Sequence, residues 1–372
     1  MKNSFKVKVL KPNNYGALEI TSLVFGPDGN VYGGVTGHKH HLFFKFDPSK
    51  EKFTDLGSPA HSEVDIHTGK TGIVTQKIHH SLVVDSTNGI VYGGTGRNIS
   101  VMSPWFRFDD EDGGRLFSYN VYTGKSKDLG IALPKQWIFC LTASFDFKYL
   151  YCLTAPLNNL VSYEISTGRK KVLGQIHGVI RGDSVASHEI ICDEKGNLYG
   201  SCRNGVLFKY DIKKEKIFET DIKLPGNDLR IDSLTRHDNG LIYGGTWESG
   251  YLFSFNPVKG KIRLIGKPNL KGTRLPALRV SPVNGKIYGA AGGGDTYDKV
   301  GAMFFEYDPK KDKIRNFGNV EIKDKKIKAA RIHALTIGND NTVYLGETGS
   351  GRAKQAERTG VNPYLYICNV FV

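Results

Sequence analysis

The chain is poor in cysteine. Its 372 residues include five cysteines, an odd number that is too small for a disulfide framework, and no two of them have the CxxC spacing of a zinc knuckle. Most lie within strand-like runs, so we expect buried free thiols at Cys140, Cys152, Cys192, Cys202 and Cys368.

Long apolar runs are also missing. No stretch approaches the ~18 apolar residues of a membrane span, and the first segment, MKNSFKVKVLKPNN, lacks the apolar core of a secretory signal. We therefore expect no membrane partner. Localisation stays undecided, because a cytoplasmic protein and the mature form of a secreted or periplasmic protein would look alike.

Acidic residues are fewer than basic ones. The 51 Lys+Arg exceed the 37 Asp+Glu, which gives a net charge of +14. This excess favours an acidic partner such as nucleic acid, an anionic surface or a uronate polysaccharide. RNP, KH and zinc-finger signatures are absent, so we predict that nucleic acid is not the partner.

An internal repeat dominates the sequence. An apolar strand, a turn of Asp, Asn or Gly, and an apolar-Tyr-Gly strand recur seven times, as in SLVFGPDGNVYGG and SLTRHDNGLIYGG. The marker tyrosines are separated by 60, 59, 48, 44, 45 and 56 residues and are Tyr32, Tyr92, Tyr151, Tyr199, Tyr243, Tyr288 and Tyr344. This spacing is typical of four-stranded propeller blades, and a residue repeated in every blade belongs to the core.

Each unit continues with a hairpin such as HLFFKFDPSKEKFTDLG, whose alternation has the period of strands. The seventh unit stops after its third strand, PYLYICNVFV, and the N-terminal FKVKVL can supply the missing outer strand. The sequence therefore predicts an all-β fold, a seven-bladed β-propeller of four-stranded blades in a single domain of residues 1–372. The N-terminal strand completes the last blade.

Propeller topology places the starts of the innermost strands and the loops between second and third strands on one face, here called the loop face. Counting back from each marker tyrosine gives a ring of strand-start residues: Thr21, His80, Phe139, His188, Asp232, Pro276 and His333. Arg230, Arg274 and Arg331 precede three of them by two residues, which places each on the same sheet face as its ring residue. The same alternation predicts that His79 points away from His80.

The loops of this face add polar and aromatic candidates, namely His38, His40, His41, Arg97, Arg203, Trp247 and Tyr297. Long insertions gather here, which favours a functional face. Each candidate has a structural alternative, because a histidine at a strand start is more often simply hydrogen-bonded. Trp247 can stack on a sugar or cover an apolar surface. Alternation also prevents His40 and His41 from binding one ion.

The seven units with apolar-Tyr-Gly-Gly strands and LFxYDPxTGK-like hairpins resemble the seven-bladed propeller polysaccharide lyases, that is, the ulvan and rhamnosyl-glucuronate lyases with their glycosidase-like relatives. The resemblance spans nearly the whole chain. It implies that a His and a Tyr or second His transfer protons while an Arg neutralises a uronate. The matching positions are His41 (or His40), His80 and Arg97. The chain departs from the pattern at Thr21, where a His is expected, and at His80, where a Tyr often stands.

The chemistry that fits is β-elimination at a uronate in a central funnel. An arginine neutralises the carboxylate, one histidine removes the C5 proton and another protonates the leaving oxygen. We predict catalytic roles for His41, His80 and Arg97, with His80 as base and His41 as acid or the reverse. The predicted substrate-binding residues are His40, His188, Arg203, Asp232, Trp247, Tyr297, Arg331 and His333.

Two other functions stay open. A glycoside hydrolase of the same propeller type would act on a uronate-linked sugar without forming an unsaturated product, and a non-catalytic propeller would bind a glycan or protein without turnover. We expect a monomer with an acidic oligo- or polysaccharide as partner. No cofactor is required, but a divalent metal in the central channel stays open because His188, His333 and Asp232 are acceptable ligand types.

A third of the basic residues have a structural explanation. Along the third-to-fourth-strand hairpins lie 17 of the 51 basic residues, where lysine commonly guards exposed sheet edges. They are Lys50, Lys52, Lys125, Lys127, Arg169, Lys170, Lys171, Lys213, Lys214, Lys216, Lys259, Lys261, Arg263, Lys310, Lys311, Lys313 and Arg315. The arginines near the histidine ring are the functional fraction, which favours a carboxylate ligand.

Overall fold

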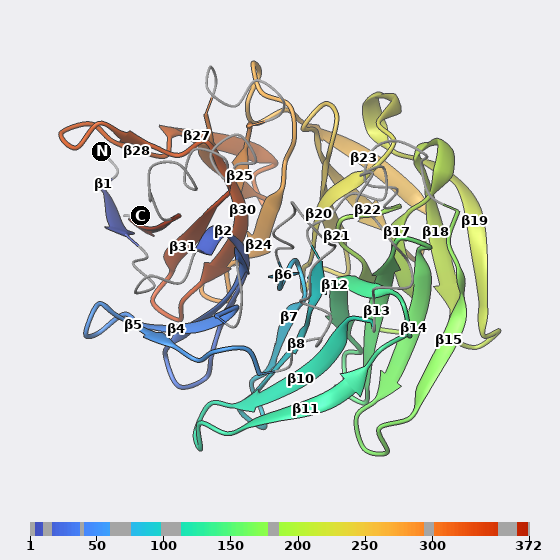
Figure 1. The fold of residues 1–372 in the computed structure, drawn as a ribbon. Coiled ribbons are helices and arrows are strands. Elements are labelled where there is room, and N and C mark those ends of the chain that lie inside the picture. Colours follow the sequence, from blue (N-terminus) through green and yellow to red (C-terminus); the bar gives the residue numbers. More distant parts are fainter. Residues whose placement is uncertain are drawn as a thin grey trace, which may run out of the picture.

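The structure is a computed structural model that describes residues 4–9, 17–37, 41–59, 76–97, 113–177, 186–293, 301–348 and 363–370. These residues form seven four-stranded antiparallel blades around a central axis (Figure 1), which confirms the predicted all-β propeller. No helix of these ranges is long and apolar enough to cross a membrane.

The strands run from the axis outwards in each blade. Blade 1 contains β2 (Ala17–Phe25), β3 (Val31–Gly37), β4 (Phe43–Asp47) and β5 (Lys52–Asp55), and blade 2 contains β7 (Leu82–Asp85), β8 (Ile90–Gly94), β10 (Arg115–Asn120) and β11 (Ser126–Ile131). Blade 3 contains β12 (Trp137–Ala143), β13 (Tyr149–Ala155), β14 (Asn159–Glu164) and β15 (Lys170–Gln175), and blade 4 contains β16 (Ile191–Cys192), β17 (Leu198–Ser201), β18 (Val206–Asp211) and β19 (Lys216–Lys223).

Blade 5 contains β20 (Ile231–Arg236), β21 (Ile242–Thr246), β22 (Leu252–Asn256) and β23 (Lys261–Gly266), and blade 6 contains β24 (Ala277–Val280), β25 (Ile287–Ala291), β26 (Met303–Asp308) and β27 (Lys313–Asn319). Blade 7 contains β30 (Arg331–Ile337), β31 (Thr342–Thr348), β32 (Tyr364–Asn369) and β1 (Ser4–Val9). Outside the blades lie β6 (Gln76–Lys77), β9 (Gly96–Arg97), the hairpin β28 (Glu321–Ile322) and β29 (Ile327–Lys328), and the 3₁₀ turns η1 (Arg203–Gly205) and η2 (Pro225–Asn227).

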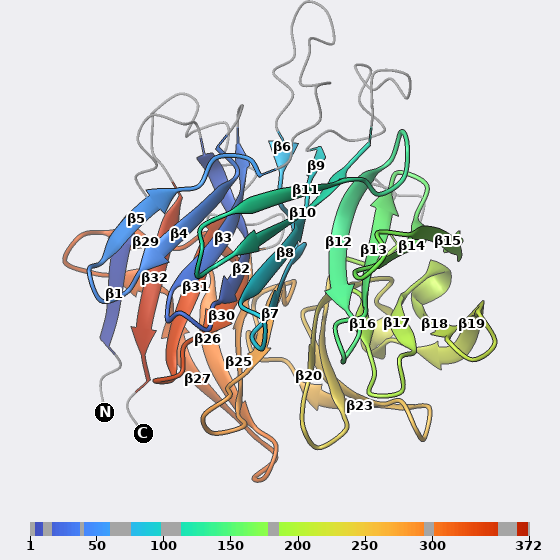
Figure 2. The same ribbon diagram turned by 90° about the horizontal axis from the view of Figure 1, so that it is seen from below.

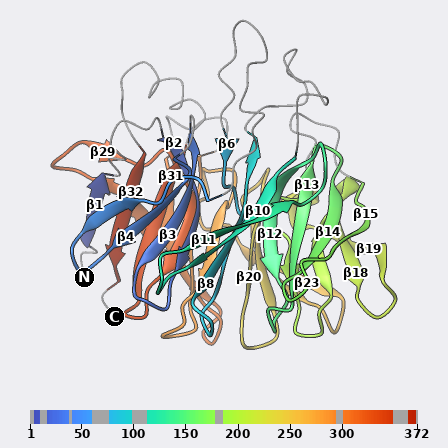
Figure 3. The ribbon, with the colours of Figure 1, turned by 60° about the horizontal axis from the view of Figure 1, so that its bottom comes forward.

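The ring is closed by its two chain ends. β1 pairs antiparallel with β32, with Ser4 opposite Asn369 and Val9 opposite Tyr364, and the two strands lie side by side in Figures 2 and 3. The predicted outer strand is therefore confirmed. Without it, β32 would present an open row of backbone hydrogen-bonding groups.

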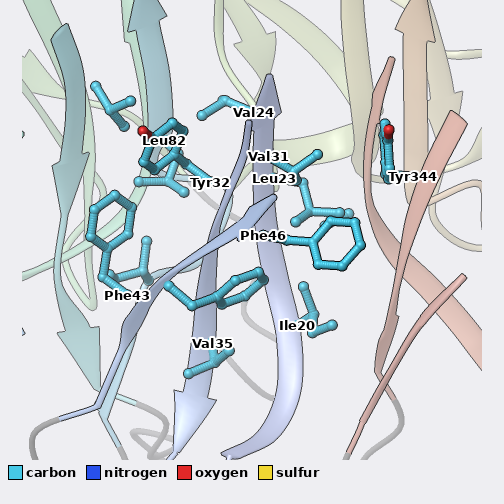
Figure 4. Packing of buried hydrophobic residues seen from close by; sticks show 14 of the residues in the cluster. Ile20, Leu23, Val24, Val31, Tyr32, Val35, Phe43, Phe46, Leu82 and Tyr344 are labelled. Carbon is cyan, nitrogen blue, oxygen red and sulfur yellow. The ribbon is translucent and has the colours of Figure 1, made fainter. Parts of the chain in front are cut away.

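The core lies between the blades. One cluster joins residues of blades 1, 2 and 7, where Tyr32 and Phe43 face Leu82 on one side and Phe46 faces Tyr344 on the other (Figure 4). All seven marker tyrosines are at most 8% exposed, as predicted for core residues. In several blades the hydroxyl also contacts the preceding turn, as in Tyr32 to Asp28 at 2.8 Å and Tyr243 to Asn239 at 3.0 Å.

The glycine after the marker tyrosine has its own packing reason. In five blades it stands directly opposite a phenylalanine of the third strand, and a Cβ there would overlap that ring. The pairs are Gly33–Phe44, Gly93–Phe117, Gly200–Phe208, Gly244–Phe253 and Gly289–Phe305. The Tyr-Gly motif thus places one aromatic ring between blades and makes room for a second on the neighbouring strand.

Two further predictions are confirmed. All five cysteines are buried free thiols, and burial raises the pKa of Cys152 to about 12, so that thiol is unreactive at neutral pH. The 17 basic residues mapped to the hairpins are all exposed along the outer strands and turns, which run around the rim of the molecule in side view (Figure 3). They leave the basic residues near the axis as a separate group.

Candidate functional site

Four histidines meet at the centre of the propeller. His79, His80, His188 and His333 each present a ring nitrogen within 4.8 Å of the others, and all four are at most 7% exposed. The ring centroids of His80 and His333 lie 4.5 Å apart, and those of His79 and His333 lie 4.8 Å apart. We call these four residues the axial histidine cluster.

The prediction that His79 points away from His80 is wrong. Their ring centroids are 4.6 Å apart. Alternation holds only within an extended strand, and both residues precede β7, which begins at Leu82. His80 also has a left-handed backbone with φ of +47°, which turns its side chain to the same side as that of His79. A left-handed non-glycine residue is costly and tends to occur at functional sites.

Hydrogen bonds at Nδ1 define the ring orientation of two of these histidines. Nδ1 of His79 lies 3.1 Å from the carbonyl oxygen of Phe139, and Nδ1 of His80 lies 2.9 Å from Oε1 of Glu189. Because both partners are acceptors, Nδ1 donates and Nε2 keeps a lone pair in the neutral ring. Among the described residues, the buried Nε2 atoms of His80 and His333 have no hydrogen-bond partner.

The surroundings keep three imidazoles neutral. Burial lowers the pKa of His79, His188 and His333 well below 6.5, and nearby cations lower it further: Lys77 at His79, Arg274 at His188 and Arg331 at His333. Burial alone would raise the pKa of Glu189, but Arg279 and the bond from His80 outweigh it and hold that pKa below its ordinary value. The site therefore joins neutral imidazoles to an ionised carboxylate.

A set of buried cations surrounds this cluster on the loop face. Lys77, Arg274 and Arg331 are at most 8% exposed, the side chain of Arg230 is 11% exposed, and the charge of each acts on at least one of the histidines. Lys77 is positioned by β6, which with β9 extends the sheet of blade 1 beyond β3. The ammonium of Lys77 lies 4.9 Å above the Phe139 ring. We call Lys77, Arg230, Arg274 and Arg331 the cation ring.

Trp247 connects the cation ring to the histidines. The guanidinium of Arg274 lies 3.3 Å and that of Arg230 lies 4.2 Å from its ring centroid, while the His188 ring is 3.9 Å away. Arg274 also makes two bonds of 2.6 and 3.0 Å to Asp232, which is fully buried. Trp247, for which stacking on a sugar and covering of an apolar surface were both open, thus contacts two side chains that carry the positive charge.

The predicted site residues divide into four groups. His80, His188, Asp232, Trp247, Arg331 and His333 gather near the axis. Arg97 is buried in β9, opposite Gln76 of β6. Two others contact outer strands: His41 pairs with Asp55 of β5, and Arg203, half-exposed, lies 3.0 Å from Glu219 of β19. His40 and Tyr297 lie outside the described residues.

Sequence reasoning missed His79, Glu189 and Lys77. The available signal was the polar residue beside a predicted ring position, in the pairs His79–His80 and His188–Glu189. Strict strand alternation predicts that the side chains of His79 and Glu189 point away from the axis. The backbone before β7 and β16 is irregular, so consecutive side chains reach the same site.

A cavity of about 450 Å³ continues from His80 and Glu189 towards the short turns of the opposite face. The innermost strands line it, with Thr142 along its length and Phe145 and Arg236 near the turns. The guanidinium of Arg236 lies 4.8 Å from the Phe145 ring centroid. The His80–Glu189 pair thus lies between the cation ring and this channel.

These features define the protein as a seven-bladed β-propeller with a polar site on its axis. No family model matches the chain, and no curated protein matches it. Among solved structures, it is similar to a streptogramin B lyase, at 12% identity and a TM-score of 0.64 over 99% of this chain and 98% of that one.

Two further structures share the fold. A virginiamycin B lyase from Staphylococcus aureus has 11% identity and a TM-score of 0.62 over 99% of this chain and all of that chain (100%). The WD40 repeats of RRP9 have 10% identity and a TM-score of 0.62 with the same coverage, 99% and 100%. At these identities, similarity shows the propeller alone, which serves both lyases and repeat proteins.

Proposed function

We propose that the protein is a carbon–oxygen lyase that cleaves a uronic-acid-containing glycan by β-elimination at the axial histidine cluster. The observation that carries the proposal is the joining of buried imidazoles and the cation ring in one site. Elimination next to a carboxylate needs both kinds of group, since the carboxylate must be stabilised and a proton must be moved.

The cation ring supplies the carboxylate site. The charges of Arg274, Arg230 and Lys77 help to lower the pKa of His188, so positive potential extends to the axis. A uronate carboxylate bound there is stabilised more strongly as negative charge develops on it during loss of the C5 proton. Arginine suits this role because its planar donors match a carboxylate.

His80 is proposed as the base. Its Nδ1 is bound to Glu189, which orients the ring and stabilises the imidazolium, and its Nε2 has a lone pair for the C5 proton. The C5–H electrons form the C4–C5 double bond, the C4–O4 bond breaks, and O4 takes up a proton. In a syn elimination the same imidazole returns that proton to O4, so His80 alone accounts for both proton transfers.

The predicted proton donor has a different observed contact. His41 pairs with Asp55 in the outermost strand of blade 1, so its role as acid stays a prediction and is not needed for the balance. Lyase chemistry is compatible with the fold, since two of the similar solved structures are named as lyases. Their printed names give no support to a polysaccharide substrate, which rests here on the cation ring.

The test is product formation from a panel of glucuronate- and iduronate-containing glycans, followed by ultraviolet absorbance of the unsaturated uronate. We expect turnover by the wild-type protein and a loss of kcat of about 10²- to 10⁴-fold in His80→Gln. His177→Gln is the control, because His177 is exposed and pairs with Glu219 away from the axis.

Three results would count against the proposal. New reducing ends without unsaturated uronate would indicate a hydrolase, tight glycan binding without turnover would indicate a binding platform, and full activity of His80→Gln would remove the base.

A further inference from the structure

We infer that His79, His188 and His333 bind a divalent transition-metal ion, with Zn²⁺ as the reference ion, on the propeller axis beside the His80–Glu189 pair. Metal binding follows from the histidine cluster alone. The role assigned to the ion, which is to bind the substrate carboxylate, rests on the proposed function.

The nitrogens are close enough to share one ion. Imidazole nitrogens bind zinc at about 2.1 Å in tetrahedral geometry, so two ligands of one ion lie about 3.4 Å apart. The cluster nitrogens already lie within 4.8 Å of one another. Binding of an ion would therefore shorten the longest separation by up to about 1.4 Å, which requires rotation about the side-chain bonds of the histidines.

The groups behind the rings suit ligation. The bond from Nδ1 of His79 to the Phe139 carbonyl leaves Nε2 as the coordinating atom, and Nε2 of His333 has no hydrogen-bond partner among the described residues. Oδ1 of Asp232 lies 3.7 Å from Nδ1 of His188. Backbone carbonyls and carboxylates behind histidines are the usual supports of metal sites, because they fix the ring and raise its basicity.

Burial also favours binding of a metal over packing of the rings alone. All four rings are at most 7% exposed, and Nε2 of His333 is buried without a hydrogen-bond partner among the described residues. If the rings served packing only, apolar side chains would fill the axis without leaving buried ring nitrogens unpaired.

His80 is set apart from the three proposed ligands by its 2.9 Å bond to Glu189. A site with three histidine ligands keeps a coordination position for substrate, as catalytic zinc sites do. The His80–Glu189 pair then lies beside that position, where its Nε2 is free to move a proton. Ligation and proton transfer are thus divided among the four rings.

The cation ring sets a condition on this site. Arg274, Arg331 and Lys77 oppose a bound cation, while Glu189 and Asp232 partly compensate them. A substrate carboxylate between the ion and the guanidinium groups adds the remaining negative charge. Ion and acidic substrate should therefore bind cooperatively, each lowering the dissociation constant of the other.

The first experiment measures the metal itself. The full chain is stripped with chelator, titrated with Zn²⁺ by calorimetry, and assayed for metal by mass spectrometry after gel filtration. We expect one ion per chain in the wild type, in His80→Gln and in the His177→Gln control. In His79→Gln, His188→Gln and His333→Gln we expect the dissociation constant to rise at least 10-fold, because loss of a residue that only supports a ligand already costs about 10- to 100-fold in affinity.

If the histidine variants fail to fold, thermal unfolding of the wild type still tests whether the protein binds the metal. Chelation should lower the midpoint, and added Zn²⁺ should restore it, because an ion that binds only the folded state stabilises it. No ion bound, an unchanged midpoint, or loss of the ion in His80→Gln equal to that in His333→Gln would overturn the inference.

Activity assays separate the two proposals. Zn²⁺ binding without elimination products would leave the metal site intact and count against the lyase. Full activity of the stripped protein on uronate glycans would support the lyase and overturn the role of the ion.

Discussion

At the scale of single residues, burial decides what a pair of opposite charges contributes. Arg274 and Asp232 make a bidentate contact between neighbouring blades at the axis, where the side chains are 5% and 0% exposed. Arg263 and Asp312 make the same contact between the same two blades at the rim, where they are 53% and 59% exposed. Water screens only the second pair.

This contrast predicts different effects of one substitution. Asp232→Ala should lower the free energy of unfolding by about 3–5 kcal/mol, because it leaves the guanidinium of Arg274 buried and uncompensated. Asp312→Ala is the matched control and should change the unfolding midpoint little. Urea denaturation of both variants measures the difference, and similar losses would show that burial does not decide the outcome.

Glu189 illustrates how one residue can act through another. It accepts bonds from Nδ1 of His80 and from the backbone N–H of Leu234 and lies 3.5 Å from Arg279. Glu189→Gln keeps the size and the acceptor oxygen but removes the charge that stabilises the His80 imidazolium. We expect kcat on a uronate glycan to fall about 10- to 100-fold, with KM nearly unchanged. A change in KM alone would indicate a purely structural role.

At the scale of the element, the Tyr-Gly motif couples two strands of each blade. In blade 5 the ring of Phe253 on β22 covers Gly244 on β21, so the glycine is needed for the packing of its cross-strand neighbour. The same arrangement in four other blades explains why the glycine recurs with the tyrosine.

The coupling is measurable by a double-mutant cycle. Gly244→Ala should destabilise the protein by about 1–3 kcal/mol through overpacking. Phe253→Leu removes the ring atoms that a Cβ at position 244 would overlap and keeps an apolar side chain. In the Phe253→Leu background, Gly244→Ala should cost clearly less than it does alone. Strict additivity of the two unfolding free energies would contradict this explanation of the motif.

At the scale of the whole molecule, pairing of β1 with β32 joins the two ends of the chain. Six residue pairs connect these strands. Removal of residues 1–9 should lower the thermal midpoint and expose the edge of β32, which favours concentration-dependent self-association. Calorimetry and light scattering measure both effects, and removal of residues 1–3 is the control because β1 begins at Ser4. An unchanged midpoint would show that closure contributes little.

The fold was predictable because its signals are local and repeated. A turn of Asp, Asn or Gly between alternating strands is a property of neighbouring residues, and seven copies at a blade-length spacing leave little freedom in the architecture. The last unit lacks a fourth strand, and the N-terminal FKVKVL can supply it, so the sequence also predicted how the ring of blades closes. The rim lysines and the buried thiols followed from the same strand pattern.

The site was predictable at the ring positions, which recur at a fixed distance before each marker tyrosine, and not at the residues beside them. His333 and Asp232 lie in β30 and β20 and reach the axis, and counting back from the tyrosine located them. The same counting found His80 and His188, but not His79 or Glu189, because the backbone before β7 and β16 departs from extended geometry. Loop residues such as His41 and Arg203 do not follow the strand repeat, so counting along the chain could not place them. In the structure they contact the outer strands.

The sequence by itself thus determined the number of blades, their closure and the surface of the rim, since these depend on spacing along the chain. Only the tertiary structure decided which polar side chains share the axis. Four histidines from blades 2, 4 and 7 meet there because ring closure brings the starts of the innermost strands together, and left-handed turns at His80 and Arg274 aim their side chains. The structure likewise separated two groups among the 51 basic residues, the 17 exposed ones along the rim and the cation ring beside those imidazoles.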